Sequence, residues 1–437
     1  MIDAVHRSIE AVYKIESARL IAGLVRVVRD VGRAEELAQD ALVAALEQWP
    51  LEGVPDNPGA WLMEVGKRRA VDAVRRGARF EQKQQALGHE IAAAQQLATP
   101  DLEARLDENV GDDLLRLVLI ACHPVLSTEG RVALTLRLLG GLTTEEIARA
   151  FLVPEPTIAQ RIVRAKRTLA EARATFEVPR GPQLRERLSS VLEVIYLIFN
   201  EGYAATAGDD VMRPGLCEDA LRLGRILAGL LPDEPEVHGL VALLELQASR
   251  AAARVDAAGD PILLLDQSRS RWDQLLIRRG LEGLARAEAL NRTQSATNAA
   301  GANGNPPASL GPYQLQAQIA ACHARARTNE ETDWTTIAAL YEALALQAGS
   351  PVVELNRAVA LSMAHGPEVG LQLVDQLVSE PSLARYHLLP SVRGDLLVKL
   401  GRADEARIEF ERAAALTKNG RERKLLLGRA AACARGD

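Results

Sequence analysis

Aromatic residues make up only 3% of the 437 residues, and no stretch alternates β-branched and polar residues for long enough to support a β-sheet. Ala, Leu, Arg and Glu dominate instead, which predicts an all-α fold. The chain also lacks any run of about eighteen uncharged apolar residues, which excludes a transmembrane helix. Because the first residues show no basic segment followed by an apolar core, we expect no signal peptide and a cytoplasmic protein.

Cysteines are few and widely separated: Cys122, Cys217, Cys322 and Cys433 contain no C-x-x-C pair. This spacing argues against a disulfide framework and against a zinc ribbon. The dipeptide Cys-His occurs at 122 and again at 322, and we interpret it as core packing, with metal or redox chemistry as the alternative. We therefore expect no metal and no cofactor.

Signatures of catalysis are missing too. No nucleophile stands beside a base, and neither an H-E-x-x-H motif nor a glycine-rich phosphate loop occurs. We expect no catalytic residues and a protein that is not an enzyme. The formal charge of −6 excludes a chain that coats nucleic acid along its whole length, so any contact with DNA must come from local basic faces.

One such face lies between Gly141 and Leu169, which reads GLTTEEIARAFLVPEPTIAQRIVRAKRTL. Apolar spacing predicts a short helix from Thr144, capped by that residue, and a second helix that begins near Glu155. The second helix points its amide, hydroxyl and basic side chains away from the apolar side: Thr157, Gln160, Arg161, Arg164 and Lys166. Two helices of this kind are typical of a helix-turn-helix that reads a major groove, and the alternative is a helical hairpin with a solvated basic face.

Two further helices carry opposite charges. In RAEELAQDALVAALEQW one face is apolar, and the other holds Glu35, Glu36, Gln39, Asp40 and Glu47, which is either a solvated surface or a site for a basic partner helix. The loop PLEGVPDNPGAW then leads into a helix whose second half is crowded with basic residues, among them Lys67, Arg68, Arg69, Arg75, Arg76 and Arg79. These residues either complement the helix dipole or form a basic track for single-stranded DNA.

The three stretches resemble regions 4 and 2 of bacterial extracytoplasmic-function sigma factors. The region 4 pattern G-L-(S/T)-x-x-E-I-A, followed by T-(V/I)-x-x-R-(L/I)-x-R-A-(K/R), is filled from Gly141 to Lys166. The acidic helix matches A-E-(D/E)-L-x-Q-(D/E), and the arginine-rich helix matches P-x-A-W-L-x-x-(I/V), which continues into A-(V/I)-D-x-x-R-R. We therefore expect a transcription initiation factor of the sigma-70 family.

The resemblance implies partners and a role for each face. Core RNA polymerase, through its β′ clamp helices and β flap, and promoter DNA are the expected partners. Polymerase would be bound by the acidic helix at Glu35, Glu36, Leu37, Gln39 and Asp40. The −35 element would be read by Thr157, Gln160, Arg161, Arg164 and Lys166. The −10 element would be held by Asp56, Asn57, Trp61, Lys67, Arg68, Arg69, Arg75 and Arg76.

Composition and motifs predict six segments in chain order. Region 2 is expected at 1–80, an acidic linker at 81–112, region 4 at 113–177, a first helical extension at 183–291, a flexible insertion at 292–312 and helical repeats at 313–437. Pro179 and Pro182 mark the joint before the extension. Within it we expect helices at 184–199, 215–231, 234–258 and 266–290.

The last segment has an internal period. GPEVGLQLVDQL begins at Gly366 and GRADEARIEFERAAAL at Gly401, close to the period of about 34 residues of tetratricopeptide repeats. This arrangement resembles a subgroup of extracytoplasmic-function sigma factors with a large C-terminal extension of that type. The extension would regulate the sigma domains and bind a protein or peptide. The alternative is a helix-turn-helix regulator, with the repeats as a sensor, that never joins polymerase.

Overall fold

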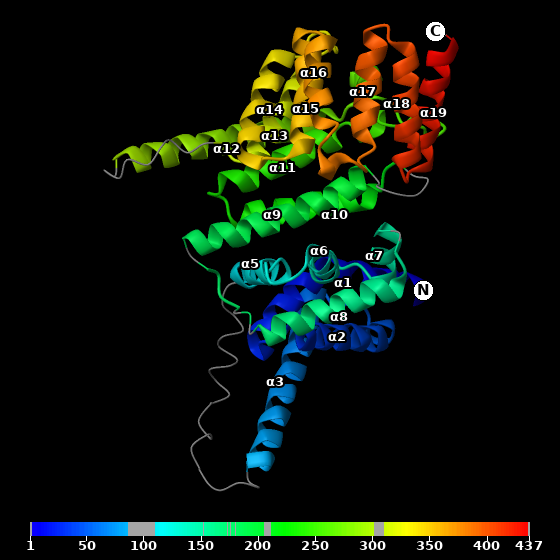
Figure 1. The fold of residues 1–437 in the computed structure, drawn as a ribbon. Coiled ribbons are helices and arrows are strands. Elements are labelled where there is room, and N and C mark those ends of the chain that lie inside the picture. Colours follow the sequence, from blue (N-terminus) through cyan, green and yellow to red (C-terminus); the bar gives the residue numbers. More distant parts are fainter. Residues whose placement is uncertain are drawn as a thin grey trace. The chain divides into compact units, whose positions relative to one another are not determined.

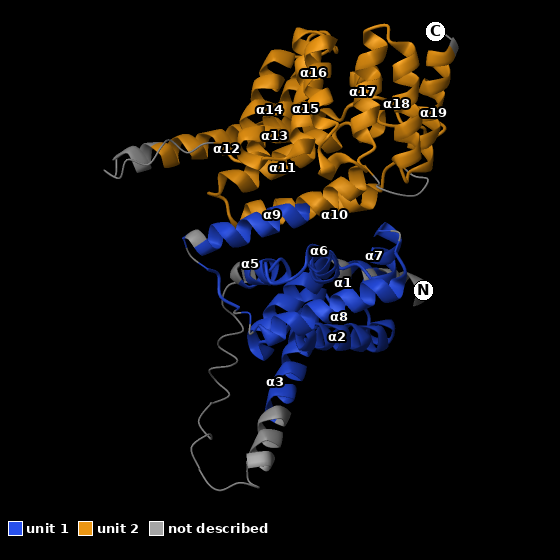
Figure 2. Ribbon diagram, in the orientation of Figure 1, with its two compact units in different colours: residues 1–195 blue, residues 196–437 orange. Residues whose placement is uncertain are grey.

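A computed structural model of the chain describes residues 2–85, 110–151, 153–172, 174, 176–179, 181–204, 211–300 and 310–435. These residues form α-helices joined by loops and short 3-10 turns (Figure 1), and their one isolated bridge, between Val255 and Pro261, belongs to no strand. The predicted all-α fold is confirmed. The chain divides into two compact units, Met1–Ile195 and Tyr196–Asp437 (Figure 2), and this division falls inside helix α9 (Pro182–Tyr203).

The first unit opens with three long helices. They are α1 (Ile2–Val28), α2 (Val31–Glu52) and α3 (Pro58–Gln85), and each packs against the other two. Asp30 caps α2, because its carboxylate accepts a hydrogen bond from the Arg33 N–H at 2.6 Å. The loop expected from Pro50 is shorter than predicted, since Pro50 lies in the last turn of α2. Gly53, at φ 90°, ends that helix.

The second half of this unit consists of shorter helices. α5 (Val110–Ala121), α6 (Thr128–Leu138), α7 (Thr144–Phe151) and α8 (Glu155–Glu171) follow, with α8 packed on α6 and α7, and α5 packed on α1. The start of α9 belongs to the same unit, because Ser190 Oγ donates to the Cys122 carbonyl at 2.6 Å. Arg131 also pairs with Glu193 at 3.0 Å. Most of the predicted linker 81–112 lies outside the described residues.

Three expectations for the extension differ from the structure, and part of the third lies outside the described residues. The helix expected at 234–258 ends earlier: after α10 (Pro214–Leu230), α11 spans Pro235–Ala248, and three 3-10 turns follow, η1 (Ala251–Ala253), η2 (Leu264–Asp266) and η3 (Arg269–Arg271). The helix expected at 266–290 starts later, as α12 (Gln274–Ala300), because Asp273 caps it by accepting from the Leu275 N–H at 2.8 Å. The insertion expected at 292–312 is wrong in its first part, since 292–300 continue α12. Residues 301–309 lie outside the description.

The remaining helices of the second unit pack in chain order. They are α13 (Pro312–Arg325), α14 (Trp334–Ala348), α15 (Pro351–His365), α16 (Pro367–Leu377), α17 (Leu388–Lys399), α18 (Ala403–Leu416) and α19 (Gly420–Arg435), with the turn η4 (Pro381–Leu383) before α17. Each of these α-helices packs on the next. Gly366 and Gly401, both at positive φ, stand at the α15–α16 and α17–α18 turns, so the sequence period corresponds to one helix pair.

Candidate nucleic-acid and polymerase interfaces

Helices α7 and α8 form the predicted helix-turn-helix. The predicted cap, Thr144, is wrong by one position: Thr143 Oγ1 accepts from the Glu146 N–H at 3.1 Å, and Glu146 accepts from the Thr143 N–H at 2.7 Å. This reciprocal pair is a capping box, which needs the acid three residues after the cap. Pro156 lies in the first turn of α8, where a missing N–H leaves no hydrogen bond unmade.

The free face of α8 carries most of the predicted −35 residues. Its opposite face is buried in the unit at Ile158, Ile162, Ala165 and Leu169. Gln160 and Arg164 are exposed, while Thr157 and Arg161 are partly exposed. Within the part of the chain that the structure describes, neither Arg161 nor Arg164 pairs with a carboxylate, so both guanidinium groups are available to a phosphate or a base edge.

Lys166 differs from the other four. Its Nζ pairs with Glu35 of α2, and Arg137 of α6 pairs with the same carboxylate, at 2.7 Å from Nε to Oε1. Glu35 is only 5% exposed, so the expectation that it lies on the free face of α2 is wrong. Two cations around one carboxylate compensate the cost of burying it. No motif in the sequence singled out Arg137, which lies in helix α6 together with Arg131.

Two other residues predicted to bind polymerase are not fully exposed either. Leu37 is 4% exposed and belongs to the core, whereas Gln39 donates from Nε2 to Glu35 at 3.2 Å. Glu36 and Asp40 remain exposed, and they pair with Arg33 at 3.1 Å and with Arg69 at 3.3 Å. The acidic surface that α2 offers to a partner is therefore centred on Glu36 and Asp40.

The loop before α3 and the first turn of α3 hold the predicted −10 residues. Asn57 caps α3, because its Oδ1 accepts from the Ala60 N–H at 3.1 Å, and Asp56 is exposed. Trp61 is partly buried and meets the buried Trp49 edge to face, with ring centroids 5.3 Å apart. That contact orients the indole of Trp61 while leaving part of it on the surface.

Basic side chains continue along α3. Arg68 pairs with Glu64 at 2.9 Å, Lys67 and Arg69 are partly buried or paired, and Arg75 is exposed. The side chain of Arg76 lies outside the described residues. Helix α3 therefore presents basic groups from Lys67 to Arg75. The ion pairs that these groups form on the exposed surface are weak, so a phosphate can take the place of the carboxylate.

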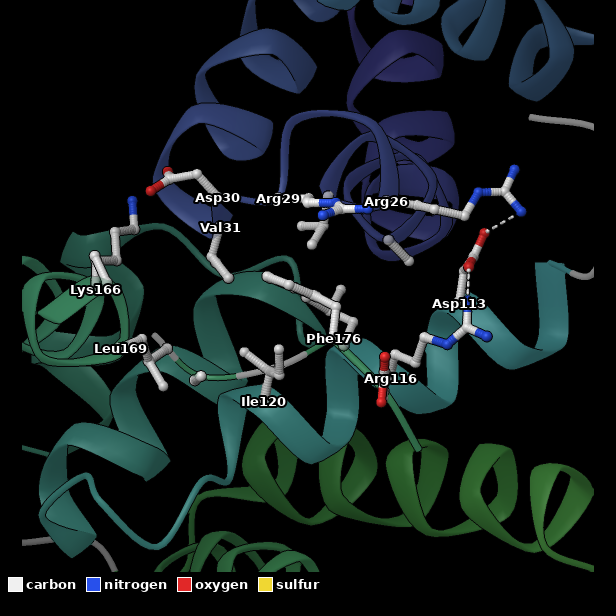
Figure 3. Close-up of a pocket in the computed structure, with 16 residues that line it drawn as sticks. Arg26, Arg29, Asp30, Val31, Asp113, Arg116, Ile120, Lys166, Leu169 and Phe176 are labelled. Atoms are coloured by element: carbon white, nitrogen blue, oxygen red, sulfur yellow. Dashed lines mark hydrogen bonds and ion pairs between the residues drawn. The ribbon is translucent and has the colours of Figure 1, made fainter. Parts of the chain in front are cut away.

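A cavity of about 660 Å³ lies between α1, α5 and α8 (Figure 3). On one side Asp113 joins two arginines, Arg26 at 3.4 Å and Arg116 at 2.9 Å. Phe176, from the segment after α8, lines the same cavity. Asp113 is 5% exposed, and this buried acid links the first helices of the unit to its second half. Sequence reasoning missed it because it placed the acids near 113 in or beside a solvated linker.

The cysteine-histidine pairs behave as packed residues. Cys122 is 1% exposed and its Sγ lies 3.3 Å from Thr135 Oγ1, and burial raises the pKa of the thiol to about 12. Burial likewise lowers the pKa of His123 to about 4 and that of His323 to about 3. Among the described residues no group of three or more His, Cys, Asp or Glu is arranged to hold a metal ion. No described helix is long and apolar enough to cross a membrane.

Three family models match the chain. Sigma-70 region 2 matches residues 13–80, sigma-70 region 4 matches 116–169, and a family of unknown function matches 187–288. These ranges contain α2, α7 and most of α3 and α8, which carry the interfaces described above. No solved structure matches.

Curated relatives agree with these matches. The chain is 43% identical over 404 residues to the uncharacterized protein R00370 of Rhizobium meliloti (strain 1021), covering 92% of this chain and 90% of that protein. It is 34% identical over 154 residues to the ECF RNA polymerase sigma factor SigK of Mycobacterium ulcerans (strain Agy99), covering 34% of this chain and 77% of SigK. It is 27% identical over 175 residues to the probable ECF RNA polymerase sigma factor SigI of Mycobacterium tuberculosis, covering 40% of this chain and 58% of SigI.

The matched segments to SigK and SigI leave most of this chain uncovered, whereas the match to R00370 extends over nearly all of it. Proteins of the sigma-70 family are not enzymes, and they associate with RNA polymerase and promoter DNA. The chain belongs to the extracytoplasmic-function group of the sigma-70 family and carries a large helical C-terminal extension.

Proposed function

We propose that this sigma factor, acting in the cytoplasm, directs core RNA polymerase to promoters by recognising a −35 element with α8 and a −10 element with α3 and the loop before it. The observation that supports this most is the free face of α8, where Gln160, Arg161 and Arg164 stand on a helix whose other face is buried. Amide and guanidinium groups on an exposed recognition helix are suited to base edges and phosphates.

The polymerase contact is assigned to the exposed acids of α2. Glu36 and Asp40 carry charge that a basic pair of helices in the β′ clamp would complement, and region 4 would meet the β flap. Leu37, Gln39 and Glu35 support that surface from within rather than forming it, because all three are buried or bonded inside the unit.

Transcription reconstituted from core polymerase, this protein and a library of promoters tests the proposal. We expect transcripts that start only at promoters with defined −10 and −35 sequences, and we expect Glu36→Lys combined with Asp40→Lys to reduce capture of core polymerase. Glu47→Lys is the matched control, since it reverses another acid of α2 outside the proposed contact. DNA binding without any polymerase-dependent transcript would instead identify a regulator that does not join polymerase.

We also propose that the helical extension regulates the sigma domains, with an activating effect, and that its repeats bind a protein or peptide. The packing of successive helix pairs from α13 to α19 supports this role, because stacked pairs leave an extended surface for a partner. The tetratricopeptide character of these pairs stays a prediction.

A further inference from the structure

Three arginines of the C-terminal unit gather on two aromatic rings. Arg250 and Arg269 lie over the indole of Trp272, with Cζ 5.4 Å and 4.9 Å from the ring centroid. Arg254 lies over the phenol ring of Tyr203 at 3.7 Å. Both rings are nearly buried, with Trp272 3% and Tyr203 9% exposed. The rings therefore hold the guanidinium groups in place through their π faces.

These arginines have no carboxylate partner among the described residues. Arg250 donates to two side-chain amides, Gln247 at 3.2 Å and Gln267 at 3.4 Å. The terminal nitrogens of Arg269 donate to two backbone carbonyls and to the side chains of Asn329 and Thr332. The Nε of Arg254 is enclosed and has no hydrogen-bond partner among the described residues. A cation that is partly withdrawn from water without an anion is unfavourable, so this arrangement calls for a compensating charge.

Other arginines of the same unit are compensated. Arg225 pairs with Glu245 at 2.9 Å and Arg393 pairs with Glu409 at 2.7 Å. The sharpest comparison is Arg429, which lies over the ring of Phe410 at 4.4 Å and also pairs with Asp395. Stacking on an aromatic ring is thus combined with an ion pair at Arg429, whereas the described residues provide no ion pair for Arg250, Arg254 or Arg269.

The charged groups near the cluster that the structure describes form no ion pair with these arginines. Glu422 acts on Arg254 at a distance, but its carboxylate already accepts from Thr417 at 2.8 Å and lies 3.3 Å from His387 Nε2. Glu330 and Glu331 act on Arg269. Arg250 feels the like charges of Arg254 and Arg269, and burial together with these charges lowers its pKa. His323 faces Arg250 and Arg269 and adds no charge near neutral pH, because its pKa is lowered to about 3.

Several buried donors at the cluster are also unused. The Tyr203 hydroxyl, the Trp272 indole N–H and the Nε of Arg254 are enclosed and have no hydrogen-bond partner. Buried polar groups in native proteins are normally bonded, and a water or an ion can be the partner of one that has none in the protein. Arg254 itself is only partly buried, so a ligand can reach its guanidinium group from solvent.

We propose that Arg250 and Arg254, oriented by Trp272 and Tyr203, form a binding site for a small ligand with a carboxylate or phosphate group. A guanidinium presents parallel N–H donors that match both groups in a bidentate contact. One oxyanion would supply the missing negative charge and would accept from Arg254 and Arg250 together. The site lies wholly within the C-terminal unit, so it does not depend on the proposed promoter recognition.

The test uses the full-length protein and three salts at matched ionic strength: sodium phosphate, sodium succinate and sodium chloride. Tryptophan fluorescence and the melting temperature are followed as each anion is titrated, since Trp272 lies under two of the arginines. We expect a saturable change with phosphate, with succinate or with both, at concentrations where chloride has no effect. Phosphate alone assigns a phosphate group to the ligand, and succinate alone assigns a carboxylate.

Variants separate this site from general salt effects. Arg254→Gln and Arg250→Gln should each raise the anion concentration needed for half of the saturable change at least tenfold. Arg254→Lys should raise it as well, because lysine keeps the charge but lacks the two parallel N–H donors of a guanidinium. Arg429→Gln is the matched control and should respond like the wild type. Without added anion, Arg254→Gln should melt no lower than the wild type, since it removes an uncompensated charge. The proposal is overturned if neither anion differs from chloride, or if Arg254→Gln and Arg254→Lys both respond like the wild type.

Discussion

At the scale of single residues, Arg161 and Arg164 stand on the same face of α8 but we expect them to contribute differently. Arg161, with Gln160 and Thr157 beside it, is the candidate for base edges, whereas the more exposed Arg164 is the candidate for phosphate. Arg161→Ala should weaken promoter binding by about 1–3 kcal/mol and reduce the sequence preference at one promoter position. Arg164→Ala should weaken binding to all promoters alike. A scan of −35 variants checks this. Equal loss on every variant with Arg161→Ala would assign Arg161 to phosphate.

Glu35 carries the second prediction at this scale. Its side chain is 6% exposed and forms ion pairs with Arg137 and Lys166, so Glu35→Ala leaves two partly buried cations without this anion. We expect a loss of about 3 kcal/mol in the free energy of unfolding, measured by urea denaturation. Glu36→Ala is the control, since its pair with Arg33 is exposed and is worth about 0.5 kcal/mol. Similar losses for the two variants would contradict a buried pairing of Glu35.

At the scale of single helices, the start of α7 depends on a capping box. Thr143→Ala removes one hydrogen bond to Glu146 and should destabilise the helix by about 1 kcal/mol. Thr144→Ala, one position later, should change stability far less, because Thr144 is already within the helix. Thermal unfolding of both variants compares the two threonines, and a larger effect at Thr144 would restore the cap predicted from the sequence.

The second prediction for single helices concerns the close packing of α17 on α18. A Cβ at Gly394 would lie 2.8 Å from the Phe410 ring, and Phe410 is fully buried. Gly394→Ala should therefore destabilise the protein by about 1–3 kcal/mol, although alanine is the better helix former. Gly428→Ala in α19 is the matched control: nothing lies within 4 Å of its Cβ, and we expect it to stabilise by about 0.5–1 kcal/mol. Differential scanning calorimetry measures whether each variant raises or lowers the melting temperature, and a stabilising effect of Gly394→Ala would contradict the close contact.

At the scale of the whole molecule, the extension is tested by truncation. Ending the chain after Glu177 removes the start of α9, where Ser190 and Glu193 contact the first unit, whereas ending it after Ile195 keeps those contacts. We expect the chain that ends after Ile195 to fold but to lose promoter-specific transcription with core polymerase, because we propose an activating extension. Circular dichroism controls for folding. A rise in transcription would indicate inhibition, and an unchanged rate would leave recruitment of a partner as the remaining role.

The sequence by itself determined the all-α class, the two helices of the helix-turn-helix and the family. These depend on apolar periodicity and on ordered motifs within about thirty residues, which a single chain displays directly. The capping residue of α7 and the end of α11 were less predictable, because a cap one residue away or a 3-10 turn is decided by a few hydrogen bonds.

Only the tertiary structure decided which charged residues are available. Glu35 and Arg137 are 102 residues apart in the chain, and periodicity placed Glu35 on the same outer face as Glu36. Burial separates the two acids, since the packing of α2 against later helices encloses one and leaves the other in solvent. The arginines on Trp272 and Tyr203 likewise come together from segments that show no shared motif. Long-range packing creates such sites, and local sequence patterns carry no information about it.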